Sequence, residues 1–145
     1  MSQLLPFKLG AEVYALELID VQEIVEHCQL HPIPGVPETV LGAIGFHGRI
    51  VPAIDLPLLL GFPAGLRSER MIVLTDEHGP VALVVDQLLR IITLDLVHSV
   101  LSQSDSEKDC IRGVLNRSGQ MISMLDLAQL RLLLQQICTG NGDRK

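Results

Sequence analysis

Aromatic residues are scarce in this sequence, which has no tryptophan, one tyrosine and three phenylalanines among 145 residues. Basic residues are also outnumbered, because 11 lysines and arginines stand against 17 aspartates and glutamates, for a formal net charge of −6. Proteins that bind nucleic acid ordinarily carry a basic stripe, and those that bind single strands also carry stacking aromatic rings. The composition therefore argues against nucleic acid as a partner.

Long uninterrupted apolar runs are missing as well. The richest stretch, residues 40–62, is broken by His47, Arg49 and Asp55 and by two prolines, whereas a membrane-spanning helix needs about 20 mostly apolar residues. The first residues, MSQLLPFKLG, lack the basic segment and apolar core of a signal peptide. We expect no direct membrane insertion and a cytoplasmic location.

Cysteines are few, and the three of them, Cys28, Cys110 and Cys138, are odd in number and far apart in the chain. In a reducing compartment we expect unpaired thiols that pack as small apolar groups. Apolar residues, in contrast, make up 48% of the chain and charged residues only 19%. A chain of this length and composition can bury a core as one domain or as two small halves that share it.

A fifteen-residue phrase occurs twice, as GAIGFHGRIVPAIDL at residues 42–56 and as GVLNRSGQMISMLDL at residues 113–127. Each copy is predicted to form a strand, a glycine turn, a second strand and the start of a helix. We interpret four glycines as structural turn residues, of which Gly48 and Gly119 supply the positive φ of the turns. The other two are Gly42 and Gly113.

Both copies end in Asp-Leu, at Asp55 and Asp126. Two equivalent aspartates could form the carboxylate dyad of an aspartic hydrolase, but such a dyad needs small and hydroxyl residues after each aspartate, and leucine follows both here. We therefore interpret Asp55 and Asp126 as helix caps, whose carboxylates accept hydrogen bonds from free backbone amides.

The rest of the chain reads mainly as short strands. Hairpins are predicted at residues 7–18 and 71–86, a short helical turn at 20–27, a proline-rich connector at 31–38, a loop at 102–109 and a C-terminal helix at 126–138. The returning strand of each repeat is apolar on both faces, which indicates strands covered from both sides. We expect a mainly β fold in which two small barrel-like halves share a core.

Catalytic and metal-binding groups are sparse. His27, Cys28 and His31 could hold a metal ion, with His47 nearby, but no second ligand pair at zinc-like spacing is present. There is no serine in a nucleophile-elbow motif and no cysteine with an evident base. We expect no enzyme activity, no catalytic residue, no cofactor and no metal, and we keep a small metal-binding protein as the least favoured alternative.

Four segments together resemble the CheW-like adaptor domains of bacterial chemotaxis arrays. In chain order these are FKLGAEVYALEL, DVQEIVE, PIPGVPETVLGAIGFHGRIVPAIDL and VALVVDQL, and the resemblance runs from about residue 4 to 137. It implies a single domain over 1–145 with two SH3-like five-stranded barrels around a shared core. The first half-barrel would span roughly 17–79, and the second roughly 4–16 plus 80–127, followed by the C-terminal helix.

The same resemblance implies a function. The chain would be a non-enzymatic signalling adaptor that couples the cytoplasmic tip of a chemoreceptor to the regulatory domain of a CheA-type histidine kinase, in chemotaxis or a related pathway. A module that binds the kinase for assembly or as a decoy, without binding a receptor, is the alternative. The partner-binding residues that the resemblance implies are Val21, Glu23, Ile24, His47, Ala82, Val84 and Val85.

One position departs from the family pattern. The family commonly has Asn-Leu-Arg-Gly at the first repeated hairpin, where this chain has Gly45-Phe46-His47-Gly48. Histidine is shorter than arginine and cannot make bidentate contacts with a carboxylate. The departure favours a divergent member of the family, serving gene regulation or surface motility through its own kinase.

Overall fold

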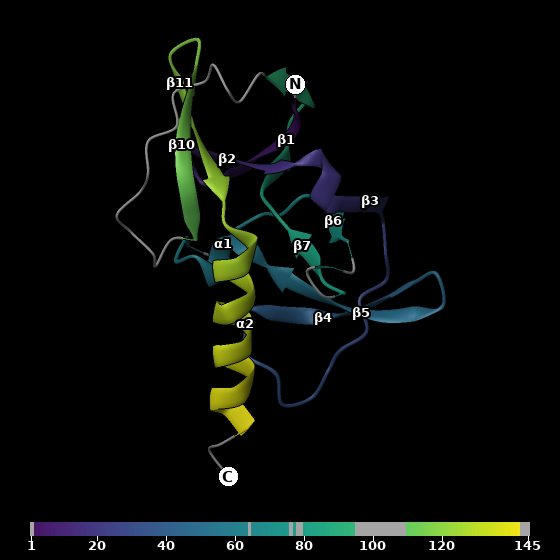
Figure 1. Cartoon of the computed structure of the whole chain (residues 1–145). Helices are drawn as coiled ribbons and strands as arrows, with labels where there is room; N and C mark the ends of the chain where they lie inside the picture. Colours follow the sequence, from purple (N-terminus) through teal and green to yellow (C-terminus); the bar gives the residue numbers. More distant parts are fainter. Residues whose placement is uncertain (1, 64, 76, 78–79, 95–109, 143–145) are drawn as a thin grey trace.

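The computed structural model describes residues 2–63, 65–75, 77, 80–94 and 110–142, and it is dominated by strands (Figure 1). This confirms the expected mainly β class. The helical elements are a 3₁₀ turn η1 (Leu18–Asp20), a short helix α1 (Leu56–Leu59) and the C-terminal helix α2 (Leu127–Gly142). The strands are β1 (Ser2–Leu9), β2 (Glu12–Glu17), β3 (Val21–Glu26), β4 (Val40–Phe46), β5 (Arg49–Asp55), β6 (Arg70–Leu74), β7 (Ala82–Val84), β8 (Gln87–Leu88), β9 (Ile92–Leu94), β10 (Ile111–Arg117) and β11 (Gln120–Leu125).

The strands form two sheets, which confirms the expected pair of SH3-like barrels. The first barrel is the five-stranded sheet β3-β6-β7-β5-β4. The second barrel is the sheet β10-β11-β2-β1-β8, in which a sixth strand, β9, also pairs with β1. An early and a late segment of the chain meet in the second barrel, because β2 pairs in parallel with β11.

The change from one barrel to the other lies later in the chain than predicted. Residues 82–84 were expected in the second half, yet β7 pairs antiparallel with β6 and parallel with β5 inside the first barrel. The predicted hairpin explains this, since strands joined by a short turn pair within one sheet. The first barrel therefore extends to Val84, and β8 is the next strand of the second barrel.

The predicted helical turn at residues 20–27 is wrong, because residues 21–26 form β3, antiparallel to β6. The register between these strands shifts between Val21 and Glu23, as at a β-bulge. A bulge inserts one residue and so changes the alternation of the two faces. Val21 and Ile24 consequently pack against the same core, and their spacing of three imitates a helix.

The repeated phrase forms two equivalent hairpins, β4–β5 and β10–β11, as predicted. Each turn has two residues, both at positive φ: His47 (48°) and Gly48 (76°), and Ser118 (53°) and Gly119 (85°). Two such residues define the type I′ turn, whose twist matches that of the flanking strands.

The other two glycines of the repeat do not lie in turns. Gly42 and Gly113 lie within β4 and β10, and the register of each hairpin shifts at these positions. Gly42 has a φ of +148°, and a β-carbon there would lie 2.7 Å from the backbone oxygen of His31. The backbone of His31, in the connector before β4, lies so close to residue 42 that only glycine fits there.

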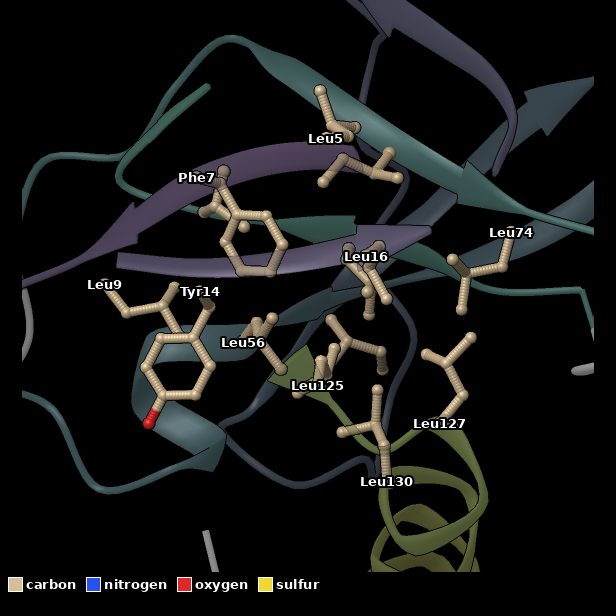
Figure 2. Close-up of a cluster of buried hydrophobic side chains, with 14 of the residues drawn as sticks. Leu5, Phe7, Leu9, Tyr14, Leu16, Leu56, Leu74, Leu125, Leu127 and Leu130 are labelled. Carbon is tan, nitrogen blue, oxygen red and sulfur yellow. The ribbon is translucent and has the colours of Figure 1, made fainter. Parts of the chain in front are cut away.

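The core has three clusters, and the largest joins the two barrels (Figure 2). Alternate residues of one strand divide between clusters: in β7, Ala82 and Val84 face the interior of the first barrel and Leu83 faces the shared core. In β2, Val13 faces the interior of the second barrel, while Tyr14 faces the shared core. The shared core draws Leu5, Phe7, Leu9, Tyr14 and Leu16 from the second barrel, Leu74 from the first, and Leu127 and Leu130 from α2.

The C-terminal helix is longer than predicted, since α2 runs from Leu127 to Gly142. It begins against the shared core and continues past the strands, as Figure 1 shows. Within the described ranges, neither α1 nor α2 has the length and hydropathy that a membrane span requires. The predicted loop at 102–109 lies outside the described residues.

Candidate functional site

Two of the residues expected to bind a partner contact each other. Glu23 lies on β3, and His47 lies in the turn between β4 and β5, 24 positions later in the sequence. His47 Nε2 is 3.2 Å from Glu23 Oε1, and the two side chains are 66% and 48% exposed. The pair therefore forms a polar feature on the surface, where a partner can reach both groups.

This pair closes the first barrel. β3 and β4 are the two edge strands of the five-stranded sheet, so the Glu23–His47 contact spans the gap between its ends. The chain after β3 also bridges to β4, because the backbone amides and carbonyls of His31 and Ala43 exchange hydrogen bonds of 2.8 and 2.9 Å. The His47 ring is further positioned by the Phe46 ring, whose centroid lies 4.3 Å away.

Three other residues expected to bind a partner are buried. Ala82 and Val84, on the central strand β7, are 0% and 3% exposed, and Val85, which directly follows β7, is 0% exposed in the shared core. Their side chains cannot contact a partner, and we remove them from the candidate surface. Val21 and Ile24 are half-buried and pack on the edge of the shared core, so they support the surface around Glu23.

Exposed aliphatic side chains on the β4–β5 hairpin and on the connector before it were missed by the sequence reasoning. Ile50 on β5 is 81% exposed and lies opposite Gly45 on β4, where a glycine covers none of its side chain. Leu30 and Leu41 are each 37% exposed, and Leu30 directly precedes the bridge between His31 and β4. We call Leu30, Leu41 and Ile50 the hairpin surface. The pairing of Ile50 with Gly45 could have been found from the sequence, because a two-residue turn at His47-Gly48 places these two residues opposite each other.

A second surface with an exposed aliphatic side chain lies near the junction of the barrels. Ile19 in η1 is 82% exposed, and with Leu18, Glu17 and the start of β1 it borders a cavity of about 460 Å³. We call Ile19 and this cavity the junction surface. A 3₁₀ turn presents its residues on successive sides, so Ile19 projects outward while Leu18 packs on the shared core.

Both aspartates of the repeat cap helices. The Asp55 carboxylate accepts a hydrogen bond from the Leu58 amide at 3.2 Å, and the Asp126 carboxylate accepts one from the Gln129 amide at 3.1 Å. Asp55 also accepts a hydrogen bond from Arg67, so its carboxylate is engaged in structure. These contacts agree with capping, and they offer no support for a hydrolytic dyad.

A buried ionic cluster, absent from the sequence reasoning, links the barrels. Arg67 Nε donates to Asp55 at 2.9 Å and Arg67 Nη1 donates to Asp86 at 2.7 Å, with 12%, 10% and 23% of the three side chains exposed. Asp86 also accepts a hydrogen bond of 2.6 Å from the amide of Gly10, in the β1–β2 turn. One guanidinium thus ties the end of β5 to the second barrel.

The residues considered for a metal site are engaged elsewhere. His27 Nδ1 lies 2.9 Å from a Glu69 carboxylate oxygen, and Cys28 packs on the interior of the first barrel. Across the part of the chain that the structure describes, no three histidine, cysteine or acidic side chains are grouped as metal ligands. The structure does not favour the metal-binding alternative.

The fold and this site define a class of protein: paired SH3-like barrels whose exposed aliphatic and polar side chains lie on outer surfaces, as in protein-interaction modules. A profile of the CheW-like domain family matches residues 3–133. The chain therefore belongs to the CheW-like domain family.

Individual relatives agree with this assignment. The chemotaxis protein CheW of Rhizobium meliloti (strain 1021) is 29% identical over 130 residues, which are 86% of this chain and 84% of that protein. The chemotaxis protein CheW of Thermotoga maritima is 23% identical over 142 residues, which are 97% and 92% of the two chains. The crystal structure of the scaffolding protein TtCheW from Thermoanaerobacter tengcongensis gives a TM-score of 0.76 at 26% identity and covers 86% of this chain and 88% of that one.

Proposed function

We propose that this chain is a non-enzymatic signalling adaptor that couples chemoreceptors to a CheA-type histidine kinase in the cytoplasm. The observation that carries the proposal is the family match over residues 3–133 together with the same paired-barrel fold in a scaffolding protein. The work of such a protein is to hold two partners at a fixed distance and angle. The shared core and the Arg67 cluster suit this task, because they join the two barrels rigidly.

An adaptor needs two separate contact surfaces, and two candidates lie among the described residues. The hairpin surface lies on β4–β5 of the first barrel, and the junction surface lies around Ile19 where the chain passes between the barrels. Exposed aliphatic residues flanked by polar groups are typical of protein-interaction sites. We assign one partner to each surface, with the Glu23–His47 pair beside the hairpin surface as its polar rim.

Substitution of each surface separately tests this assignment. We expect Ile50→Glu to abolish binding of one partner and Ile19→Glu to abolish binding of the other, because a buried, unpaired carboxylate costs more than a contact of this size provides. Titrations of the purified chain with the kinase regulatory domain and with receptor fragments in nanodiscs measure the two affinities. Leu66→Glu is the matched control, since Leu66 is 95% exposed in a different loop.

Either of two results would count against the proposal. If both substitutions leave both affinities unchanged, the surfaces are wrong. If the chain binds the kinase domain tightly but no receptor, it acts as an assembly or decoy module, the alternative that the family relationship does not favour.

The histidine in the first hairpin offers a second test. Arginine at position 47 could donate two parallel hydrogen bonds to a receptor carboxylate, which the shorter imidazole of His47, now 3.2 Å from Glu23, cannot do. We expect His47→Arg to strengthen coupling to an ordinary chemotaxis receptor by a few-fold, about the value of one surface ion pair. Receptor-stimulated kinase phosphorylation measures the coupling, and an unchanged or lower stimulation would contradict the role given to this pair.

A further inference from the structure

An apolar groove lies on the opposite side of the β4–β5 hairpin from its exposed tip. It has a volume of about 340 Å³ and lies between α2, the proline-rich connector, β4, β5 and the residues before β7. Its apolar lining includes Val36, Val40, Pro52, Val81 and Leu134. Neither the hairpin surface nor the junction surface shares a residue with it.

The charge of this groove is opposite to that of the chain. The protein has a net charge of −6, yet among the described residues that line the groove the charged one is the basic Arg131. Arg131 Nη1 donates a hydrogen bond of 3.1 Å to the backbone carbonyl of Glu77, which positions the guanidinium at the rim. A guanidinium has five N–H donors, so this bond leaves capacity for an incoming carboxylate.

One face of α2 forms a wall of the groove. Arg131, Leu134 and Gln135 have the spacing i, i+3 and i+4, which places them in one stripe along the helix. Figure 1 shows that α2 continues past the strands. This stripe brings Leu134, flanked by Arg131 and Gln135, against the apolar residues of the connector, β4 and β5, and an apolar trough beside a helix can accept a second helix.

We propose that this groove docks a helix of a partner protein that carries aliphatic side chains along one face and a carboxylate next to them. The aliphatic side chains would cover Val40, Pro52 and Leu134, and the carboxylate would pair with Arg131. This contact is additional to the two surfaces of the adaptor, and it does not depend on which partners those surfaces bind.

The experiment uses the isotopically labelled full chain and a synthetic helical peptide with leucines along one face and one glutamate beside them. We expect saturable shifts in the amide resonances of the groove residues. Affinity should fall about tenfold with Arg131→Glu, because an attraction becomes a repulsion, and severalfold with Val36→Lys. Arg90→Glu and Leu66→Lys, at exposed positions outside the groove, are the matched controls.

Two further ligands distinguish a partner helix with a carboxylate from other molecules that could occupy the groove. A peptide with glutamine in place of glutamate should bind the native chain more weakly and should lose little further affinity with Arg131→Glu. Decanoate supplies an aliphatic chain and a carboxylate without a helix. The proposal is overturned by decanoate binding without peptide binding, by peptide shifts centred on Ile50 or Ile19, by equal loss in the control variants, or by no saturable binding at millimolar peptide.

Discussion

Gly42 is a residue whose replacement even by alanine should lower the stability of the fold. Its φ of +148° is unfavourable for other residues, and a β-carbon would lie 2.7 Å from the His31 backbone oxygen. We expect Gly42→Ala to lower the free energy of unfolding by about 2 kcal/mol or more. A β-carbon at Gly45 in the same strand would meet no atom within 4 Å, so Gly45→Ala should change stability by less than about 0.5 kcal/mol. Urea unfolding measures both, and equal losses would contradict the packing argument.

Arg67 is the residue on which the link between the barrels depends. Its removal would leave the carboxylate of Asp55, 10% exposed, without its ionic partner, and would also release Asp86. We expect Arg67→Met to cost about 3 kcal/mol of stability, as found when one partner of a buried ion pair is removed.

The matched control is Arg112, whose contact with Glu17 is longer, at 3.6 Å, and more exposed. Arg112→Met should cost less than about 1 kcal/mol. In addition, hydrogen exchange at the Gly10 amide, which donates to Asp86, should become faster in Arg67→Met alone. A protected Gly10 amide in that variant would mean that the cluster does not hold the β1–β2 turn.

At the scale of elements, the two repeated hairpins end in helix caps that look alike in the sequence but differ in surroundings. Asp126 accepts an amide hydrogen bond at the start of α2, whereas Asp55 also pairs with Arg67. Asparagine caps helices as well as aspartate does, so Asp126→Asn should be neutral within about 0.5 kcal/mol. Asp55→Asn should cost about 2 kcal/mol, because the charge-assisted bond to Arg67 is lost. Thermal unfolding measures the difference, and equal effects would refute it.

The hairpins were predictable because they depend on local signals. Glycine turns and apolar runs fix β4–β5 and β10–β11, and α2 follows from its helical spacing. β3 was not predictable in the same way, because a bulge between Val21 and Glu23 changes the alternation that marks a strand. A bulge is defined by how two strands pair, so the sequence of one strand alone does not predict it.

The candidate site was predictable only in part. Glu23 and His47 could be named from the family resemblance, but their contact depends on the closure of the first barrel. The buried positions of Ala82, Val84 and Val85 follow from β7 having a core on each side, which a short apolar run does not distinguish from an exposed patch. Arg67 carried no signal, because its partners lie 12 and 19 positions away.

The molecule as a whole should unfold in one step, because the shared core contains side chains from both barrels and from α2. Tyr14 is the one tyrosine of a chain without tryptophan, and it is buried in this core on the side of the second barrel. Its fluorescence and the far-ultraviolet circular dichroism should therefore give the same midpoint in urea.

A substitution in the first barrel tests whether the two barrels unfold together. Ile72 on β6 is suitable, since it is fully buried in the same core as Tyr14. Ile72→Ala should lower the free energy of unfolding by about 3 kcal/mol. The Tyr14 midpoint should move together with that of circular dichroism, although Tyr14 belongs to the other barrel. Two separate midpoints would show that the barrels are independent units.

The parallel pairing of β2 with β11, in which Val13 lies opposite Ile122, also determines an order of events during synthesis. The first barrel is contiguous, since β3 to β7 occupy residues 21–84, and it can close while the ribosome is still making the remainder. The N-terminal hairpin is translated earlier, yet one edge of it lacks its neighbour until β11 has left the exit tunnel. The β1–β2 hairpin is therefore made before the first barrel but completed after it, and its open edge in the nascent protein is exposed to wrong pairing in the interval.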